Sequence, residues 1–476
     1  MKNVLLLLFS MVIMISCGKG PETVTVNADN SNLFSPTDSI SAETETSEDE
    51  EFIHIKLGEI AKIESLDPLF ATSNSEFRIL NLVYDRLVKL HLDGNIGPAL
   101  AKRWTVSNNS TQYTFHLRSD AFFHDSPVFE GNTGRKVVAS DVKYIFERMA
   151  QANVPGFASR YFNDIRGFNA YQNENEYVKN PELRVINSIE GIRVRNDSTI
   201  SFILKRPSGN FLTRLAHPRA SVYPRENVPS SRATIQQAAG SGVFRFIQHE
   251  NNSHLLTVNE DYFGQKPSIN RLDVISGLSE RDLFQEFAST NLHALIELSP
   301  SILTTVADST GTLQSSIYKN YALQSPSVYS YYNLYYNRDS NQRQQAYHLL
   351  KSLNSDDLLS SPALGSISTY IPDSLTVNET DSVQLISTQT EHPFEMYLLN
   401  NLGPVANSLG YTFSMSPTYA INNITAFSTR PYSNARPILS WRAPLYILHH
   451  NSVSGIKIEA APWNLDVSSI ELNEVN

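Results

Sequence analysis

The sequence predicts a mixed α/β or α+β fold, and three observations lead to this prediction. The chain has 476 residues, which is enough for two or three domains with cores of their own. Hydrophobic residues make up 41% of the chain and charged residues 18%, as in an ordinary soluble globular protein. Apolar residues recur with the period of a strand in some segments and with the period of a helix in others, and neither period dominates.

The clearest pair of elements lies between residues 98 and 149. In residues 112–118 apolar side chains alternate with polar ones, which indicates a half-buried strand. Further on, Ser140 is a favourable N-cap residue, and Asp141 in the first turn suits the helix dipole. Four apolar residues then follow at helical spacing on one face: Val142, Ile145, Phe146 and Met149.

The other elements follow from the same two periods. Gly240-Ser241-Gly242 predicts a tight turn with close backbone approach, and a hairpin around residues 250–252 follows it. Gly410 is placed to end a helix. The other expected strands are 52–60, 201–204, 269–275, 292–298, 327–337, 411–415, 444–449 and 455–459, and apolar helical stripes lie in 79–87, 346–353 and 394–409.

The first 16 residues are expected to be a signal peptide. Met1-Lys2 is a small positive region, and the apolar run from Val4 to Ile15 is too short for a comfortable transmembrane helix. Met14-Ile15-Ser16 before Cys17 resembles the bacterial lipobox, which implies cleavage before Cys17 and its acylation. The alternative is a cleaved signal peptide in which Cys17, the single cysteine of the chain, is accidental.

Residues 17–51 would form a lipidated, disordered tether. The segment after the cysteine is rich in Ser, Thr, Asp, Glu and Asn and has few large apolar residues, so it cannot bury enough surface to order itself. It is either a spacer that holds the folded body off a membrane or a dispensable tail. The net charge of −10 argues against nucleic acid as a partner, which would need a basic face.

A search for catalytic and metal-binding motifs finds none. The chain has no nucleophile elbow and no phosphate-binding loop, and one cysteine cannot make a thiolate metal site. His249 and His254 are five residues apart, where a helical zinc motif needs four, and the adjacent pair His449-His450 fits packing or surface positions better. We therefore expect no metal, no cofactor and no enzymatic activity.

Eight segments, taken in order, carry a family resemblance. They are Ser65-Leu66-Asp67-Pro68, Val83-Tyr84-Asp85-Arg86-Leu87-Val88, Pro98-Ala99-Leu100-Ala101 with Trp104, Tyr113-Thr114-Phe115-His116-Leu117-Arg118, Asp125-Ser126-Pro127-Val128, Ala139-Ser140-Asp141-Val142, Gly240-Ser241-Gly242-Val243-Phe244, and Asn259 to Lys266. Together they resemble the bacterial extracellular solute-binding proteins of family 5, the peptide- and nickel-binding type. The resemblance is strong from about residue 52 to about residue 275 and thin after residue 355.

The resemblance implies an α/β fold of the periplasmic-binding-protein kind, class II type, with two lobes that close on a ligand about two crossover strands. The first lobe would comprise residues 52–327 and carry an extra subdomain at about 91–225. The second lobe would comprise residues 328–443 and be shortened to about half the usual length, and residues 444–476 would return to the first lobe.

The resemblance also implies a function and partners. The protein would capture a peptide or similar small solute between its lobes and deliver it to the permease complex of an ABC transporter. We expect a monomer in the cell envelope, facing the periplasm and anchored to a bacterial membrane through its lipid. The alternative is an envelope lipoprotein that keeps the fold, has lost uptake and serves a structural or accessory role.

One departure from the family concerns the ligand. In peptide binders of the family, the aspartate of a W-x-x-D segment can hold the terminal amine of the peptide. The nearest match here is Trp441-Arg442-Ala443-Pro444, with proline in place of aspartate, so a buried amine would be badly paired. Arg442 instead favours an anionic group, or else it is a solvated surface residue. Trp441 is either a wall of the cleft or part of the core.

The remaining candidate ligand-binding residues come from two segments. Glu64, Ser65 and Asp67 lie in the loop before the first helix, and Tyr329 and Tyr331 lie on the tyrosine-rich crossover strand. For Asp67 the alternative is a turn residue before Pro68.

Overall fold

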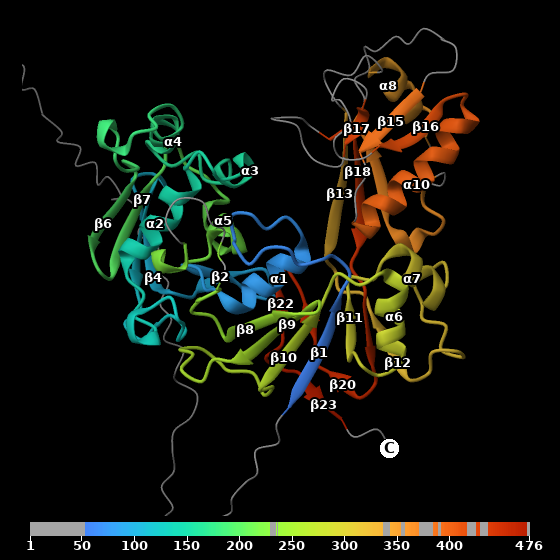
Figure 1. The fold of residues 1–476 in the computed structure, drawn as a ribbon, viewed down its shortest axis with the longest axis horizontal. Coiled ribbons are helices and arrows are strands. Elements are labelled where there is room, and N and C mark those ends of the chain that lie inside the picture. Colours follow the sequence, from blue (N-terminus) through green and yellow to red (C-terminus); the bar gives the residue numbers. More distant parts are fainter. Residues whose placement is uncertain are drawn as a thin grey trace, which may run out of the picture.

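The computed structural model describes residues 53–228, 235, 237–336, 343–353, 358–370, 384–388, 392–416, 425–428 and 437–473. The expected signal peptide, Cys17 and the acidic tether lie outside the described residues. Within these ranges three sheets of four or more strands carry the fold (Figure 1). None of the helices in the same ranges has the length and apolar character needed to cross a membrane.

A seven-stranded sheet has β1 near its centre. Its strand order is β12-β19-β11-β1-β10-β9-β8, and β1 pairs in parallel with both β10 and β11. The other pairs are antiparallel. The strands are β1 His54–Glu59, β8 Phe244–Glu250, β9 Ser253–Val258, β10 Arg271–Ile275, β11 Ala294–Ile296, β12 Tyr321–Gln324 and β19 Ile447–His450.

Helices cover both faces of this sheet (Figure 1). Helix α1 (Asn74–Val83) packs on one face, and α6 (Glu280–Ala288) and α7 (Pro300–Val306) pack on the other. Because successive side chains of a strand point to opposite faces, Ile296 of β11 joins the core under α1 while Leu295 joins the core under α6 and α7.

A four-stranded antiparallel sheet of order β4-β5-β7-β6 lies beside α1 (Figure 1). Phe146 of α2 packs against Phe202 of β7 with ring centroids 4.9 Å apart. The core of the four-stranded sheet is continuous with the core under α1, so the four-stranded and seven-stranded sheets are packed as one unit. The elements are β4 Ala101–Ser107, β5 Gln112–Leu117, β6 Ile192–Asn196, β7 Thr199–Ile203, α2 Ala139–Met149, α3 Gly156–Ser159, α4 Phe168–Tyr177 and α5 Phe211–Ala216.

A six-stranded sheet of order β14-β18-β13-β17-β15-β16 forms the third body. Tyr332 of β13 and Trp441 of β18 face α10, where both rings contact Phe394. The core on this face continues into the core under α6 and α7. The elements are β13 Tyr329–Tyr336, β14 Ser366–Thr369, β15 Gln384–Thr388, β16 Thr412–Ser416, β17 Thr425–Ser428, β18 Leu439–Pro444, α8 Arg343–Lys351 and α10 Pro393–Ser408.

Short elements complete the described chain. Three two-stranded ladders are present, and 3₁₀ turns connect several of the larger elements. The ladders pair β2 Val88–Leu90 with β3 Ile96–Pro98, β20 Val453–Ser454 with β23 Glu471–Leu472, and β21 Lys457–Ile458 with β22 Leu465–Asp466; the 3₁₀ turns are Glu130–Asn132, Pro181–Leu183, Pro218–Ala220, Arg225–Asn227 and Pro362–Leu364.

The described chain passes between the seven-stranded and the six-stranded sheet at two points. Residues 325–328 lead from β12 to β13, and residues 445–446 lead from β18 back to β19. The two passages are hydrogen-bonded to each other, since the backbone N–H of Leu445 donates to the carbonyl oxygen of Val328 at 3.2 Å. Paired connections of this kind are where hinge motions between two bodies are absorbed.

Several local predictions are confirmed, and others are wrong. Helix α1 ends at Val83, so Leu87 of the expected helical stripe lies beyond it, and residues 445–446 interrupt the expected strand 444–449. The expected hairpin is β8 and β9, and its turn residues Asn251 and Asn252 have φ of +47° and +69°, as the tightest hairpin turns require. A Cβ at Gly240 would lie 1.9 Å from the carbonyl oxygen of Val83, which confirms the close backbone approach. Ser140 is not the N-cap of α2; the cap is Val138, whose N–H donates to the Asp141 carboxylate at 3.0 Å.

Phe115 of β5 tests the core of the four-stranded sheet. It is fully buried, and its ring centroid lies 5.8 Å from that of Phe202. Phe115→Ala should lower the free energy of unfolding by about 3–5 kcal/mol because it removes buried apolar surface and leaves a cavity. Urea unfolding followed by tryptophan fluorescence measures this loss, with Trp104 at 6.3 Å from the ring as a local reporter.

Phe122→Ala is the matched control, because 49% of the Phe122 side chain is exposed. It should change the free energy of unfolding by less than about 1 kcal/mol. Equal losses in the two variants would contradict the assignment of Phe115 to the core.

Candidate functional site: the Arg78 junction and the tyrosine face

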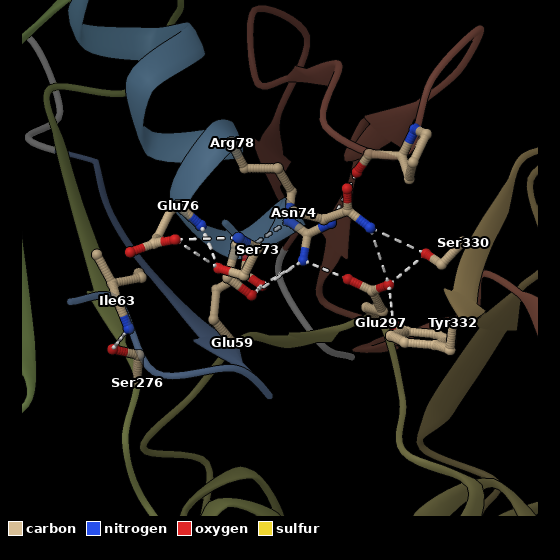
Figure 2. Close-up of polar contacts among 12 residues, drawn as sticks. Glu59, Ile63, Ser73, Asn74, Glu76, Arg78, Ser276, Glu297, Ser330 and Tyr332 are labelled. Atoms are coloured by element: carbon tan, nitrogen blue, oxygen red, sulfur yellow. Dashed lines mark hydrogen bonds and ion pairs between the residues drawn. The ribbon is translucent and has the colours of Figure 1, made fainter. Parts of the chain in front are cut away.

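A buried polar network joins the two larger sheets. We call it the Arg78 junction, and Figure 2 shows most of its contacts. It lies where β1 and β11 end, where α1 begins and where β13 enters the six-stranded sheet. Its members are Glu59, Asn74, Ser75, Arg78, Glu297, Ser330 and Tyr332.

Arg78 is fully buried and is the centre of this network. Its Nε and Nη2 donate to the two carboxylate oxygens of Glu59 at 2.6 and 2.5 Å, and Nη2 also donates to Oε2 of Glu297 at 2.8 Å. Its Nη1 donates to the carbonyl oxygen of Pro462 at 2.7 Å. A guanidinium charge can remain out of water only with such pairing, so these partners are fixed relative to one another.

Glu297 receives contacts from both sides of the junction. Its Oε1 accepts hydrogen bonds from the hydroxyl of Tyr332 at 2.9 Å, from the amide of Asn74 at 3.3 Å and from the hydroxyl of Ser330. The backbone of Glu297 is left-handed, with φ of +59°. This conformation costs a non-glycine residue about 1 kcal/mol or more, so the surrounding contacts must hold it in place.

The pKa values of the two carboxylates of the junction shift in opposite directions, although both are buried and both face Arg78. Burial raises the pKa of Glu59 above its ordinary value of 4.5, although Arg78 and the hydroxyl of Ser75 act in the opposite direction. Burial also acts to raise the pKa of Glu297, but Arg78 and the hydroxyl of Ser330 outweigh it and leave this pKa lowered. Glu297 therefore keeps its charge at lower pH than Glu59 does.

The carboxylate of Glu76 folds the preceding loop onto the first turn of α1. Its Oε1 accepts from the backbone N–H groups of Glu64 and Ser65 at 3.2 and 2.9 Å, and its Oε2 accepts from that of Thr72 at 2.6 Å. The same Oε2 accepts from the backbone N–H of Ser73 at 3.0 Å (Figure 2). Glu76 N–H in turn donates to the Ser73 hydroxyl, which completes a capping box. The side chain of Glu64 is left exposed and that of Ser65 half-buried.

Asp67 is held inside the same loop. It is fully buried, and its carboxylate accepts from Arg148 of α2 at 2.8 and 2.5 Å and from the N–H of Leu69 at 3.1 Å. Its carbonyl oxygen accepts from the N–H of Phe70 at 3.0 Å. These contacts fit the turn alternative, with an ion pair that fixes the loop on α2.

The six-stranded sheet exposes a polar aromatic surface on the side away from α10. We call it the tyrosine face: Tyr329, Tyr331, Asn333, Ser366, Ser368, Ser440 and Arg442, placed together by the register of β13, β18 and β14. Tyr331 is 60% exposed, and the Arg442 guanidinium lies 3.6 Å from the ring centroid of Tyr329. Three predicted residues, Tyr329, Tyr331 and Arg442, are therefore neighbours.

Trp441 lies on the opposite face of the same sheet. It is fully buried, its Nε1 donates to the carbonyl oxygen of Leu364 at 2.7 Å, and its ring lies 5.4 Å from that of Phe394. Of the two alternatives for Trp441, its position fits core packing. The structure thus brings together the two tyrosines and Arg442, places Glu64 and Ser65 in the loop that leads to Asn74, and buries Asp67 and Trp441 elsewhere.

The tyrosine face carries hydroxyls, an amide, aromatic rings and the exposed guanidinium of Arg442. Within the described ranges, no cluster of three or more His, Cys, Asp and Glu residues is arranged to hold a metal ion. His249 and His254 face each other across the β8–β9 hairpin with ring centroids 4.2 Å apart. Their placement is that of a cross-strand packing pair.

Comparison with known proteins identifies the family. Residues 95–351, more than half of the chain, match the family described as bacterial extracellular solute-binding proteins, family 5 Middle. The chain belongs to this family. Members of the family are extracellular or periplasmic binding proteins.

Relatives of this family 5 protein support the same fold. It is 32% identical over 182 residues to di/tripeptide-binding protein 4 of Pseudomonas aeruginosa, and 29% identical over 221 residues to the dipeptide-binding protein of Escherichia coli. These stretches cover 37% and 44% of this chain and only 31% and 38% of the relatives. The chain thus matches about a third of the length of these curated relatives.

Solved structures share the whole architecture. The binding protein AgaA from A. tumefaciens R10, solved in complex with agropinic acid, superposes with a TM-score of 0.67 at 13% identity, over 89% of this chain and 99% of that one. This likeness establishes the fold, an α/β periplasmic-binding-protein fold of the family 5 type, as the sequence predicted.

Sequence reasoning missed the residues of the Arg78 junction. One signal was present: Glu59 and Glu297 each directly follow the apolar part of a predicted strand, where a charged residue is unusual. Nothing in the local sequence pairs them, since 238 positions separate the two carboxylates and Arg78 lies on a helix whose buried stripe was expected to be apolar.

Arg78→Leu tests whether the junction is held by charge pairing. The variant leaves Glu59 and Glu297 buried without their cation, which should cost about 3–5 kcal/mol of unfolding free energy at pH near 7. Without Arg78, burial is no longer opposed by its charge, and the pKa of Glu59 and of Glu297 should rise above that in the parent. The folded variant then takes up more protons than the folded parent as the pH falls toward 4.5, the ordinary value, so the deficit should shrink. Denaturant unfolding of variant and parent across this pH range measures the difference.

Arg166→Leu is the control. Arg166 pairs with Glu190 at 3.6 Å on the surface, where the two side chains are 48% and 58% exposed. Loss of such a pair should cost less than about 1 kcal/mol, without the recovery at low pH. A deficit of Arg78→Leu that grows as the pH falls would contradict the charge assignment.

Proposed function

We propose that this chain is a solute-binding lipoprotein that captures a peptide or similar small solute and delivers it to the permease complex of an ABC transporter. The observation that carries this proposal is membership of the family together with two sheets joined by two hydrogen-bonded passages beside the tyrosine face. The first lobe would comprise residues 52–327, with the subdomain at 91–225, and the return 444–476; residues 328–443 would form the second lobe.

Solute would bind on the side of the hinge that carries the tyrosine face. Binding sites between domains combine aromatic surface with a few polar groups that fix orientation, and Tyr329, Tyr331 and Arg442 offer both. Glu64 and Ser65 are candidates from the first lobe, because the loop that carries them leads to Asn74, which is bonded to Ser330 of β13 at 3.0 Å. On the other side of β13, buried core continues from one sheet to the other and leaves no such surface.

The proposed location is the cell envelope, facing the periplasm. Acylation of Cys17 would anchor the chain to a bacterial membrane, with residues 18–51 as the spacer, and the protein would act as a monomer without cofactor or catalytic step. The chemical nature of the solute is not set by the fold, since family relatives are di- and tripeptide-binding proteins while AgaA was solved with agropinic acid. The comparisons lend no support to the alternative of an accessory protein without uptake function.

Ligand-dependent stability tests the proposal. A solute that binds only the folded chain, present at a hundred times its Kd, should raise the free energy of unfolding by about 2.7 kcal/mol. Thermal unfolding of the purified full chain against short peptides, organic acids and sugars measures this rise, and native mass spectrometry detects co-purified solute.

Tyr331→Ala should weaken the response to solute without changing the stability of the solute-free chain, because Tyr331 is largely exposed. Tyr177→Ala is its control, since Tyr177 is 76% exposed and lies on α4, outside the tyrosine face. Indifference of the parent chain to every compound, together with no co-purified solute, would refute the proposed function.

A further inference from the structure

The place where an open α/β sheet usually holds a ligand is filled here by the chain itself. Ligands of such sheets bind outside the carboxyl ends of parallel strands, next to a helix N-terminus. In this protein Glu59 ends β1, Glu297 follows β11, and both are at most 2% exposed. Arg78 and Asn74 of the first turns of α1 bond to them, and Tyr332 closes the other side (Figure 2).

Every guanidinium nitrogen and carboxylate oxygen at the centre of the Arg78 junction is already engaged by the chain itself. All three guanidinium nitrogens of Arg78 donate to oxygen atoms of the chain, and each carboxylate oxygen of Glu59 and Glu297 accepts at least one hydrogen bond. A solute that entered here would have to replace the charge-assisted hydrogen bonds that Arg78 already makes with two buried carboxylates. Solute contacts must therefore lie beside the junction rather than within it.

The tyrosine face and the Arg78 junction share strand β13, whose successive residues alternate between them. Ser330 and Tyr332 of β13 point into the junction, so Tyr329 and Tyr331, which alternate with them, point to the opposite face. The residues of this face on β13, β18 and β14 are hydroxyl-bearing, amide-bearing or aromatic, and Arg442 carries a positive charge among them. None of the residues that define the face is acidic.

Arg442 is held in place by an aromatic ring, and among the described residues no carboxylate pairs with it. Its guanidinium lies over the ring of Tyr329 at 3.6 Å, and register places Arg442 between Tyr331 on one side and Ser366 on the other. Stacking on an aromatic ring restricts the side chain and leaves the edge of the guanidinium, with its N–H donors, free to bind. Arg118 provides a contrast. Its guanidinium lies 3.8 Å from the ring centroid of Phe263, but it already donates to the carboxylate of Asp120 at 2.7 and 3.0 Å.

We propose that Arg442 is the specificity-determining residue of the solute site and that the solute carries a carboxylate or similar planar anion, which the Arg442 guanidinium binds through two hydrogen bonds while Tyr331 contacts the rest of the molecule. This inference rests on the proposed solute-binding function. It adds the charge of the solute and the residue, Arg442, that binds the charged group. It also accounts for the segment Trp441-Arg442-Ala443-Pro444, which supplies a cation and no carboxylate.

Matched pairs of probes test the charge of the solute. The probes are short N-acetylated peptides with a free terminal carboxylate and the same peptides as terminal amides, titrated by calorimetry into the purified full chain. The parent chain should bind the carboxylate form roughly tenfold or more tightly than the amide, as expected for a charge-assisted hydrogen bond. Arg442→Gln should remove this preference, and Arg442→Lys, which keeps the charge but lacks the planar fork, should retain part of it.

Arg118→Gln is the matched control, because it removes another arginine that stacks on an aromatic ring, far along the chain from the tyrosine face. It should leave the preference for the carboxylate unchanged. The thermal midpoint of each variant without probe shows that the fold is intact.

The outcomes separate the two proposals. Equal binding of carboxylate and amide forms by the parent chain, or an unchanged preference in Arg442→Gln, would overturn the role of Arg442 and leave the solute-binding function standing. Failure of every probe, and of every short peptide, organic acid and sugar in the wider panel, would overturn the solute-binding function and this inference with it.

Discussion

The buried charge of Arg78 is the constraint on which the arrangement of the sheets depends. A guanidinium out of water must be paired, and here its partners come from the ends of β1 and β11 and from the C-terminal segment. Through Glu297 the same network reaches Ser330 and Tyr332 of the six-stranded sheet. A buried Arg78 guanidinium without its partners would be costly. The network therefore specifies one relative position for these elements, which are far apart in sequence.

This position gives the two faces of β13 different roles. Tyr332 and Leu334 face α10 and join a core that continues under α6 and α7, so on that side the sheets share buried apolar surface. Tyr329 and Tyr331 face away from it and remain accessible beside the Arg78 junction. The bodies built on the seven-stranded and six-stranded sheets are packed together on one side and are joined by two adjacent passages at the edge of the accessible face. Relative motion of the two bodies is therefore expected mainly about these passages.

The family assignment fixes the architecture and leaves the chemistry of recognition open. Relatives of similar fold bind different solutes, because backbone and packing residues define the fold whereas a few side chains at the site select the ligand. In this chain the segment Trp441-Arg442-Ala443-Pro444 departs from the W-x-x-D pattern that the family resemblance implies, and it contains the proposed site residue Arg442. The polar atoms of loop 60–73 are largely used internally, by Glu76 as a cap and by Asp67 as an anchor to Arg148. The side chains of Lys62, Glu64 and Thr72 remain exposed in that loop, and Ser65 is half-buried.

The sequence by itself predicted some of the strands and helices, among them β5, α2 and the β8–β9 hairpin, and it identified the family, because period, turn chemistry and short motifs are local properties. It also identified Tyr329, Tyr331 and Arg442 as candidates. Only the tertiary structure decided that Trp441 and Asp67 are buried, that Val138 caps α2, and that Arg78 joins Glu59 to Glu297. Burial and ion pairing depend on which distant segments meet, and no local pattern carries that information.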